Sequence, residues 1–147
     1  MLKRLGHKQF PGTLIMDVNR PEVMAQVCAA FVEYERALVA NDIDVMNDLF
    51  WHAPQTVRYG IAEIQHGGDA VRAWRALCEP VAPSRQLHRT VVTTFGTDYA
   101  TVSTEFTNDT TPLLGRQMQT WVRIGTSSDG RHGWKIVVAH VSMIPPP

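Results

Sequence analysis

Two polar side chains stand among apolar neighbours in the first half of the chain, and both suit chemistry inside a pocket. Tyr34 belongs to an apolar helical stripe, so its phenol is expected to point into the core, where a buried hydroxyl needs a partner. Arg58 lies between Val57 and Tyr59 on a predicted strand, so its side chain points to the opposite face from theirs. That face is either buried, or exposed with Arg58 on the surface or paired with Glu63. A buried guanidinium requires an anion, and its fork can hold a carboxylate. The alternatives are a core tyrosine with a surface arginine, or a proton donor beside a carboxylate clamp.

A second polar set lies in the strand-like half of the chain. Gln117, Gln119 and Trp121 alternate, so they share one face of a strand. Amides between apolar neighbours suit hydrogen bonding to a urea-like or carboxylate ligand. The same pattern also fits a polar outer face that is interrupted by one tryptophan.

The last predicted strand carries a further pair of polar side chains. His140 and Ser142 share a strand face with Val138 and Trp134 if the alternation is regular. His140 is then either a core histidine with a satisfied hydrogen bond or a polar group in a pocket wall.

The third predicted helix carries Arg72, Trp74 and Arg75. Charged residues at this density are typical of a solvated helix that one tryptophan anchors to the core. Arg75 is within reach of a pocket mouth, but the pattern favours solvent for both arginines.

The sequence contains no motif for nucleophilic catalysis or for metal binding. The nucleophile patterns Gly-x-Ser-x-Gly and Ser-x-x-Lys do not occur, and the six histidines have no metal-ligand spacing. Cys28 and Cys78 share no motif with a histidine and are expected to be buried free thiols in a cytoplasmic protein. We therefore expect no metal ion and no cofactor, and any catalysis would use acid–base and electrostatic effects.

The composition limits the classes of protein that remain. With 147 residues, 44% of them hydrophobic and 19% charged, the chain suits one folded domain and is too apolar for disorder. Lys plus Arg (14) balances Asp plus Glu (14), so a nucleic-acid partner is not expected. No apolar run approaches the roughly 20 residues of a membrane span, and the N-terminus does not resemble a signal peptide.

Helical periodicity in the first half gives way to alternation in the second half. The spacing of Asn19 and Glu22 is that of a capping box at the start of the first helix. The predicted helices cover residues 20–41, 43–50 and 70–80, and the predicted strands cover 56–59, 62–66, 87–95, 98–108, 114–125 and 133–143.

Helices followed by a four-strand meander indicate a segregated α+β domain. We expect an N-terminal arm over residues 1–18 and a single domain over 19–147, in which a strongly curved antiparallel sheet wraps around the long first helix and the short helices. Such a cone is open at one end, between helix and sheet, where a small ligand fits.

Several segments in combination resemble the AtzH-like family, which also includes HpxZ-type proteins. The resemblance covers about residues 20–143. The segments that carry it are Tyr34-Glu35-Arg36-Ala37-Leu38, Asn41-Asp42, Leu49-Phe50-Trp51, Thr56-Val57-Arg58-Tyr59-Gly60 with Glu63, Arg89-Thr90-Val91-Val92-Thr93-Thr94-Phe95-Gly96, Gly115-Arg116-Gln117 with Gln119-Thr120-Trp121-Val122, and Gly133-Trp134 leading to Ala139-His140-Val141-Ser142.

The resemblance implies the nuclear-transport-factor-2-like (cystatin-like) cone fold. It also implies a metal-independent, decarboxylating amidohydrolase that converts 1,3-dicarboxyurea into allophanate, or an equivalent role in oxalurate breakdown. The family's proposed catalytic pair matches Tyr34 and Arg58: Arg58 would clamp a substrate carboxylate while Tyr34 donates or shuttles a proton at the adjacent amide. The substrate-binding residues expected around them are Glu63, Gln119, Trp121, His140 and Ser142.

Two other functions fit the same residues. Members of this family are usually encoded beside amidase-signature hydrolases, so the chain is alternatively a non-catalytic ligand-binding protein that partners such an enzyme. An isomerase or epoxide hydrolase of the same superfold would instead need an internal carboxylate, for which Glu63 and Glu105 are the candidates. Apolar positions on the outer sheet face, such as Val91, Phe95 and Trp121 or their alternates, indicate a homodimer.

Overall fold

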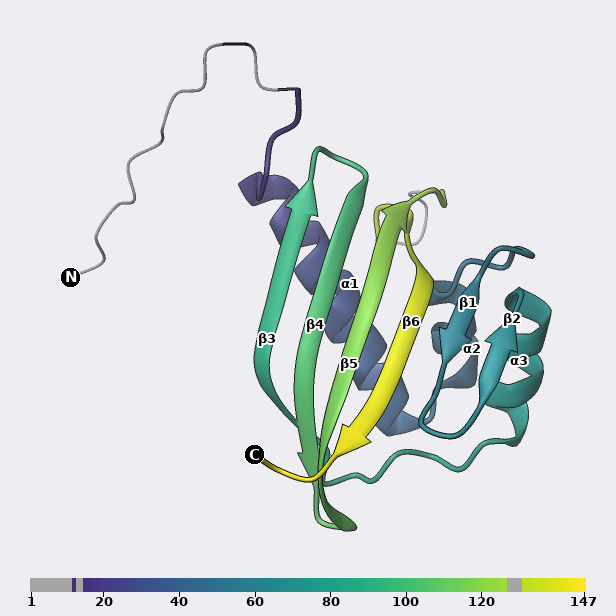
Figure 1. Cartoon of the computed structure of the whole chain (residues 1–147). Coiled ribbons are helices and arrows are strands. Elements are labelled where there is room, and N and C mark those ends of the chain that lie inside the picture. The colour runs from purple at the N-terminus through teal and green to yellow at the C-terminus, as the bar shows by residue number, and fades with distance from the viewer. Residues whose placement is uncertain (1–11, 13–14, 127–130) are drawn as a thin grey trace.

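The computed structural model describes residues 12, 15–126 and 131–147 of the chain (Figure 1). Most of the expected N-terminal arm (1–18) and residues 127–130 lie outside these residues. The elements are α1 (Pro21–Ala40), α2 (Ile43–Leu49), β1 (Val57–Tyr59), β2 (Ile64–His66), α3 (Gly68–Leu77), β3 (Gln86–Phe95), β4 (Tyr99–Asn108), β5 (Thr111–Arg123) and β6 (Trp134–Ile144). The α+β prediction is confirmed, and the predicted elements agree with the observed ones to within a few residues. Within the described part of the chain, no helix combines the length and apolarity of a membrane span.

The six strands form one sheet in the order β2-β1-β6-β5-β4-β3. Strands β3 to β6 are the predicted antiparallel meander, but β1 pairs in parallel with β6, so the sheet is mixed. The expectation of an antiparallel sheet holds for the other strand pairs but not for β1 and β6, because β1, which precedes the meander, lies beside its last strand and runs in the same direction. Figure 1 shows α1 crossing one face of the meander, with α2, α3, β1 and β2 grouped beyond β6.

The apolar stripe of α1 packs against that inner face of the sheet. Val27, Phe31 and Tyr34 are all buried on it, and Trp121 and Ile136 of the sheet are fully buried opposite. The helix ends at Asn41, as predicted, because that residue takes a left-handed backbone (φ 53°). The left-handed backbone of Asn41 thus sets how far α1 extends across the sheet.

The start of α1 differs from the predicted capping box. Arg20 is the N-cap and makes no side-chain cap hydrogen bond. Asn19 has a left-handed backbone (φ 58°), and its side-chain oxygen accepts a hydrogen bond from the backbone N–H of Thr94 in β3. Pairing with the sheet edge therefore replaces the cap, because the chain that enters the helix runs beside β3.

A β-bulge changes the facing of β6 midway along its length. Thr120 of β5 pairs with Val138 and Trp121 pairs with Ile136, so Val137 has no partner opposite it. A residue inserted in this way reverses the in–out alternation that follows. Trp134 and Ile136 are buried before the bulge, and Ala139 is buried after it.

A buried polar cluster joins α1 to the sheet. Arg85, which precedes β3, donates from Nε to Oε2 of Glu35 at 2.9 Å and from Nη2 to Gln117 Oε1 at 3.1 Å. Gln117 donates in turn to Glu35 Oε1 at 2.9 Å. The guanidinium carbon also lies 4.0 Å from the centre of the Phe106 ring. The charges of Arg85 and Glu35 thus neutralise each other inside the fold.

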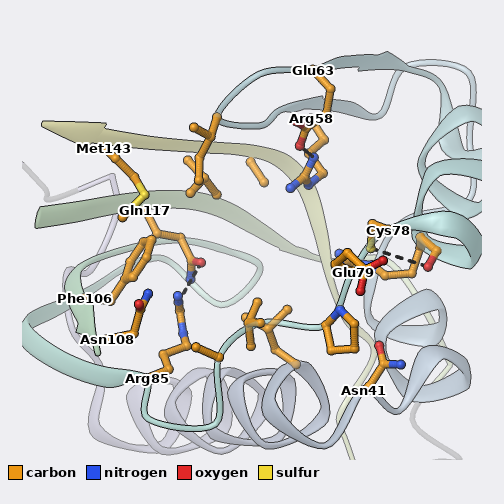
Figure 2. A pocket seen from close by; sticks show the side chains of 18 of the residues that line it. Asn41, Arg58, Glu63, Cys78, Glu79, Arg85, Phe106, Asn108, Gln117 and Met143 are labelled. Atoms are coloured by element: carbon orange, nitrogen blue, oxygen red, sulfur yellow. Dashed lines mark hydrogen bonds and ion pairs between the residues drawn. The ribbon is translucent and has the colours of Figure 1, made fainter. Parts of the chain in front are cut away.

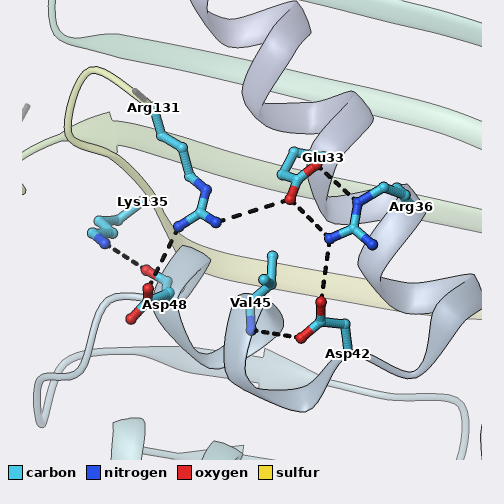
Figure 3. A network of polar contacts seen from close by, with 7 residues as sticks. All are labelled: Glu33, Arg36, Asp42, Val45, Asp48, Arg131 and Lys135. Atoms are coloured by element: carbon cyan, nitrogen blue, oxygen red, sulfur yellow. Dashed lines mark hydrogen bonds and ion pairs between the residues drawn. The ribbon is translucent and has the colours of Figure 1, made fainter. Parts of the chain in front are cut away.

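A second network on the surface ties α1 and α2 to the start of β6 (Figure 3). Arg36 donates hydrogen bonds to Glu33 and to Asp42, and Arg131 forms ion pairs with Glu33 and Asp48. The hydrogen bonds from Arg36 hold the pKa of the Glu33 carboxyl below its usual value of 4.5. Since that pKa is lowered on folding, the stabilisation is present at neutral pH and is lost as the pH falls through the lowered pKa.

We predict that Arg85→Met destabilises the fold by about 3 kcal/mol, because it leaves the Glu35 carboxylate buried without its counter-charge. The double variant Glu35→Gln/Arg85→Met removes both charges and should regain more than half of that loss. Urea unfolding of the three proteins measures the difference. A double variant less stable than the single one would contradict this account.

We predict a small, pH-dependent effect for Glu33→Gln. Both residues of the Glu33–Arg36 pair are accessible to water, so the loss at neutral pH should be about 0.5 kcal/mol or less. It should shrink with added salt and vanish at a pH well below 4.5, where the native carboxyl is also neutral. Chemical unfolding at both pH values tests this, and a difference that persists in acid would count against it.

Candidate functional site

A cavity of about 280 Å³ opens where the cone predicts it, between α1, α3, the sheet and the segment that leads into β3. Its lining is polar and apolar in patches (Figure 2). Arg58 and Glu63 lie together on one wall, and Arg85 and Gln117 lie together on another. Such a chamber suits a small ligand with polar groups at more than one end.

Tyr34 projects from α1 into this cavity and is only 4% exposed. The rings of Phe50 and Trp121 pack around its phenol, with centres 6.0 Å and 6.4 Å from the tyrosine ring. Its hydroxyl oxygen accepts a hydrogen bond from Nη2 of Arg75 at 3.3 Å. Among the described residues no acceptor takes the phenol's own proton, which is therefore available to a ligand.

Arg58 lies in the same cavity and is 8% exposed, so its strand face is the inner one. Nη1 donates to Oε1 of Glu63 and to Oε1 of Gln65, each at 2.9 Å. The guanidinium carbon stacks 3.6 Å from the centre of the Trp74 ring. Both interpretations of the sequence hold in part: Arg58 is buried in the pocket wall and is also paired with Glu63.

Arg75 is the functional candidate that sequence reasoning missed. It lines the cavity from α3 and is 3% exposed, so the prediction of a solvated arginine is wrong. The helix turns Val71, Arg75 and Cys78 toward one side, at spacings of four and three. That stripe was visible in the sequence and was the signal for a buried position.

The two glutamines and Trp121 lie on one buried face, as alternation predicts. Gln119 and Gln117 line the cavity, but Gln117 is engaged by Glu35 and Arg85. Trp121 is fully buried behind the lining and donates from Nε1 to Gln119 Oε1 at 3.1 Å. Trp121 is thus placed to orient Gln119 rather than to contact a ligand itself.

His140 and Ser142 lie on the outer face of the sheet, away from the cavity. The ring of His140 packs against Tyr59, with centres 5.9 Å apart, and Ser142 accepts a hydrogen bond from Arg116. Their expected place in the pocket wall is wrong because the bulge at Val137 reverses the alternation that the prediction assumed. The inward positions of this part of β6 are Ala139, Val141 and Met143.

Charge is distributed unevenly over the cavity wall. Three arginines line it, and Arg58 and Arg85 each have a carboxylate partner. Glu63 and Glu79 are the acidic residues of the lining, whereas Glu105 lies on the outer face near Arg89. No group of three or more metal-ligating side chains occurs among the described residues. The arrangement can therefore bind a small anion and offer it a proton.

Several solved structures of bacterial proteins share this fold. A cystatin-like fold protein from Burkholderia xenovorans is 72% identical, with a TM-score of 0.85 over 90% of this chain and 99% of its own. A protein of unknown function from Pectobacterium atrosepticum is 47% identical, with a TM-score of 0.80 over 87% and 95%. An NTF2-like protein of unknown function from Pseudomonas putida is 16% identical, with a TM-score of 0.65 over 84% and 87%, and supports the fold alone.

The fold expected from the sequence, a cystatin-like or nuclear-transport-factor-2-like cone, is thereby confirmed. None of the curated proteins matches the chain. The AtzH-like family model matches residues 16–147, which include every residue of the cavity wall. The chain belongs to the AtzH-like family.

Proposed function

We propose that this protein is a decarboxylating, amidohydrolase-type enzyme that acts on a small carboxylated urea, of the 1,3-dicarboxyurea-to-allophanate type or its oxalurate-pathway equivalent. One observation carries the proposal: the Tyr34 phenol and the Arg58 guanidinium, both on largely buried residues, line the same cavity. Membership in the AtzH-like family supports the substrate class. Gln119 and Glu63 supply further hydrogen-bonding groups in that wall.

In the proposed reaction, the N–H groups of Arg58 bind a carboxylate of the substrate. Tyr34 gives its proton to the adjacent nitrogen, and the carbon–nitrogen bond to that carboxylate breaks with its electron pair left on nitrogen. The carboxylate leaves as carbon dioxide, and the phenolate recovers a proton from water. One proton is consumed for each dicarboxyurea dianion that becomes allophanate. A positioned acid–base group of this kind contributes typically about 10² to 10⁴ in rate.

The alternative is a non-catalytic protein that binds the same small anion and partners an amidase-signature hydrolase. The cavity and its charges support binding equally well under either function. An isomerase or epoxide hydrolase has less support, because Glu105 is outside the cavity and the Glu63 carboxylate is held by Arg58.

We predict that the purified protein accelerates the conversion of dicarboxyurea to allophanate above the spontaneous rate. ¹³C NMR, which detects allophanate and carbon dioxide, measures this conversion. Tyr34→Phe should reduce kcat by about 10²-fold or more, because it removes the transferable proton. Arg58→Gln should reduce kcat/KM by a similar factor, because it removes donors to the carboxylate.

Matched controls separate chemistry from folding. Tyr99→Phe removes the hydroxyl group of an exposed tyrosine, and Arg72→Gln removes a charge from the exposed surface of α3. Both variants should keep native activity. Full activity in Tyr34→Phe and Arg58→Gln would refute the mechanism. A native protein with no turnover that co-purifies with an amidase-signature hydrolase would favour the accessory function.

We also propose a homodimer through the outer face of the sheet. The register aligns one row of side chains across all six strands, and Ile64, Tyr59, Met118 and Val91 of that row are exposed. An exposed apolar row of this length is typical of a face that a partner covers. The sequence predicts Trp121 or its alternates as outward positions on this face. Trp121 is buried inside the fold, and the exposed residue of β5 in this row is Met118.

We predict that the native protein has twice the chain mass of 16.5 kDa in solution. Met118→Glu should shift it to the monomer, because an isologous contact would bring two buried carboxylates into one interface. Val32→Glu, at an exposed apolar position on α1, is the control and should leave the dimer intact. Light scattering after size exclusion gives the masses, and a monomeric native protein would exclude this proposal.

A further inference from the structure

Arg75 differs from the other two arginines of the cavity in its electrostatic surroundings. Arg58 has Glu63 at 2.9 Å and Arg85 has Glu35 at 2.9 Å. No carboxylate of the described residues forms an ion pair with Arg75, and Glu79, which also lines the cavity, is exposed. Arg75 is nonetheless the most buried of the three.

The hydrogen bonds of Arg75 are also incomplete. Nη2 donates to the Tyr34 hydroxyl at 3.3 Å, while Nε is buried and has no hydrogen-bond partner among the residues that the structure describes. Its other close neighbours are aromatic: the guanidinium carbon lies 5.0 Å from the centre of the Trp74 ring and 5.8 Å from that of Phe50. Aromatic faces attract a cation weakly but do not neutralise it.

A guanidinium in this position is costly for the empty protein. Arginine remains charged in proteins, so the group cannot escape the cost of burial by losing its proton. Burying a charge without a counter-charge or a full set of hydrogen bonds disfavours the folded state. An anion that enters the cavity would supply both the missing charge and the missing hydrogen-bond acceptor.

We propose that Arg75 is the anion receptor of this cavity: it neutralises a carboxylate of the ligand and holds the Tyr34 phenol beside that carboxylate. Arg58, already neutralised by Glu63, then contributes hydrogen-bond donors without net charge. Arg58 and Arg75 both line this cavity, and both guanidinium carbons lie within 5.0 Å of the centre of the Trp74 ring, so one small ligand in the cavity would lie near both groups. This inference rests on the proposed function for the identity of the ligand, but it requires only that a small carboxylate binds.

The proposal assigns the ligand a chemical class. A ligand held by Arg75 must carry at least one carboxylate, and an uncharged urea or amide of the same shape would leave the guanidinium unneutralised. The phenol accepts its hydrogen bond from Arg75 and keeps its own proton for the ligand. A carboxylated urea meets both conditions.

The test uses malonate, a dicarboxylate with no carbon–nitrogen bond to cleave, and malonamide, its uncharged counterpart. Malonate should raise the melting temperature of the native protein and of Arg72→Gln, a charge-removing control on the exposed side of the same helix. In Arg75→Met, half-saturation should require at least about tenfold more malonate, and Arg75→Lys should fall between the two. Malonamide should produce no shift in any of them.

Stability without ligand gives a second, independent measurement. In a buffer free of carboxylates, Arg75→Met should unfold at the same urea concentration as the native protein or at a higher one, because it removes an unneutralised buried charge. An arginine with a purely structural role would give the opposite result.

Three outcomes would overturn the proposal. They are a native protein that malonate does not stabilise, an equal malonate shift in Arg75→Met, or stabilisation by malonamide as large as that by malonate. Because malonate is not a substrate for the proposed reaction, a lack of dicarboxyurea turnover would refute the enzyme and leave the receptor intact. Turnover of dicarboxyurea together with any of these three outcomes would support the enzyme and refute the assignment of Arg75 as the anion receptor.

Discussion

Neutralisation of buried charge is the constraint on which the rest of this structure depends. Three guanidinium groups lie under one small curved sheet, and each must find negative charge or remain a cost to folding. Glu35 from α1 neutralises Arg85, and Glu63 from the loop after β1 neutralises Arg58. In the described part of the chain, the only side-chain hydrogen-bond partner of the Arg75 guanidinium is the Tyr34 phenol. Carboxylates of the protein thus neutralise two of these guanidinium groups, and the third is left for a ligand.

The features of the fold that depend on local periodicity could be predicted from the sequence. The apolar stripe of α1 and the alternation along β4 and β5 are local patterns, so the helix-lined cone followed from them. The parallel pairing of β1 with β6 and the bulge at Val137 were not predictable, because both are set by hydrogen bonds between segments far apart in the chain. The bulge alone explains why His140 and Ser142 were assigned to the wrong face.

The candidate site was predictable to the same extent. Tyr34 was found because it lies on an apolar helical stripe that must face inward. Alternation left Arg58 either buried or on the surface, and the family resemblance supported it as the partner of Tyr34. Arg75 was missed because a helix with several charges is usually solvated, and that general tendency outweighed its place on the stripe of Val71 and Cys78. A charged residue on the buried side of a helix breaks a local rule, and such breaks concentrate at functional sites.

The two paired arginines also differ in how firmly their partners are held. Glu35 is 11% exposed and fixed by Gln117, whereas the Glu63 side chain is 30% exposed at the cavity rim. Glycine at residue 60 leaves room for this position of Glu63, since a Cβ there would overlap the Glu63 carboxylate unless that side chain shifted. The Glu63–Arg58 pair is therefore the more accessible of the two, and its guanidinium can offer a ligand hydrogen bonds while Glu63 keeps it neutral, whereas the Glu35–Arg85 pair is closed on itself. The cavity thus combines a firmly held ion pair, a more accessible ion pair and an unneutralised guanidinium, and only the last of these lacks a counter-charge until a ligand binds.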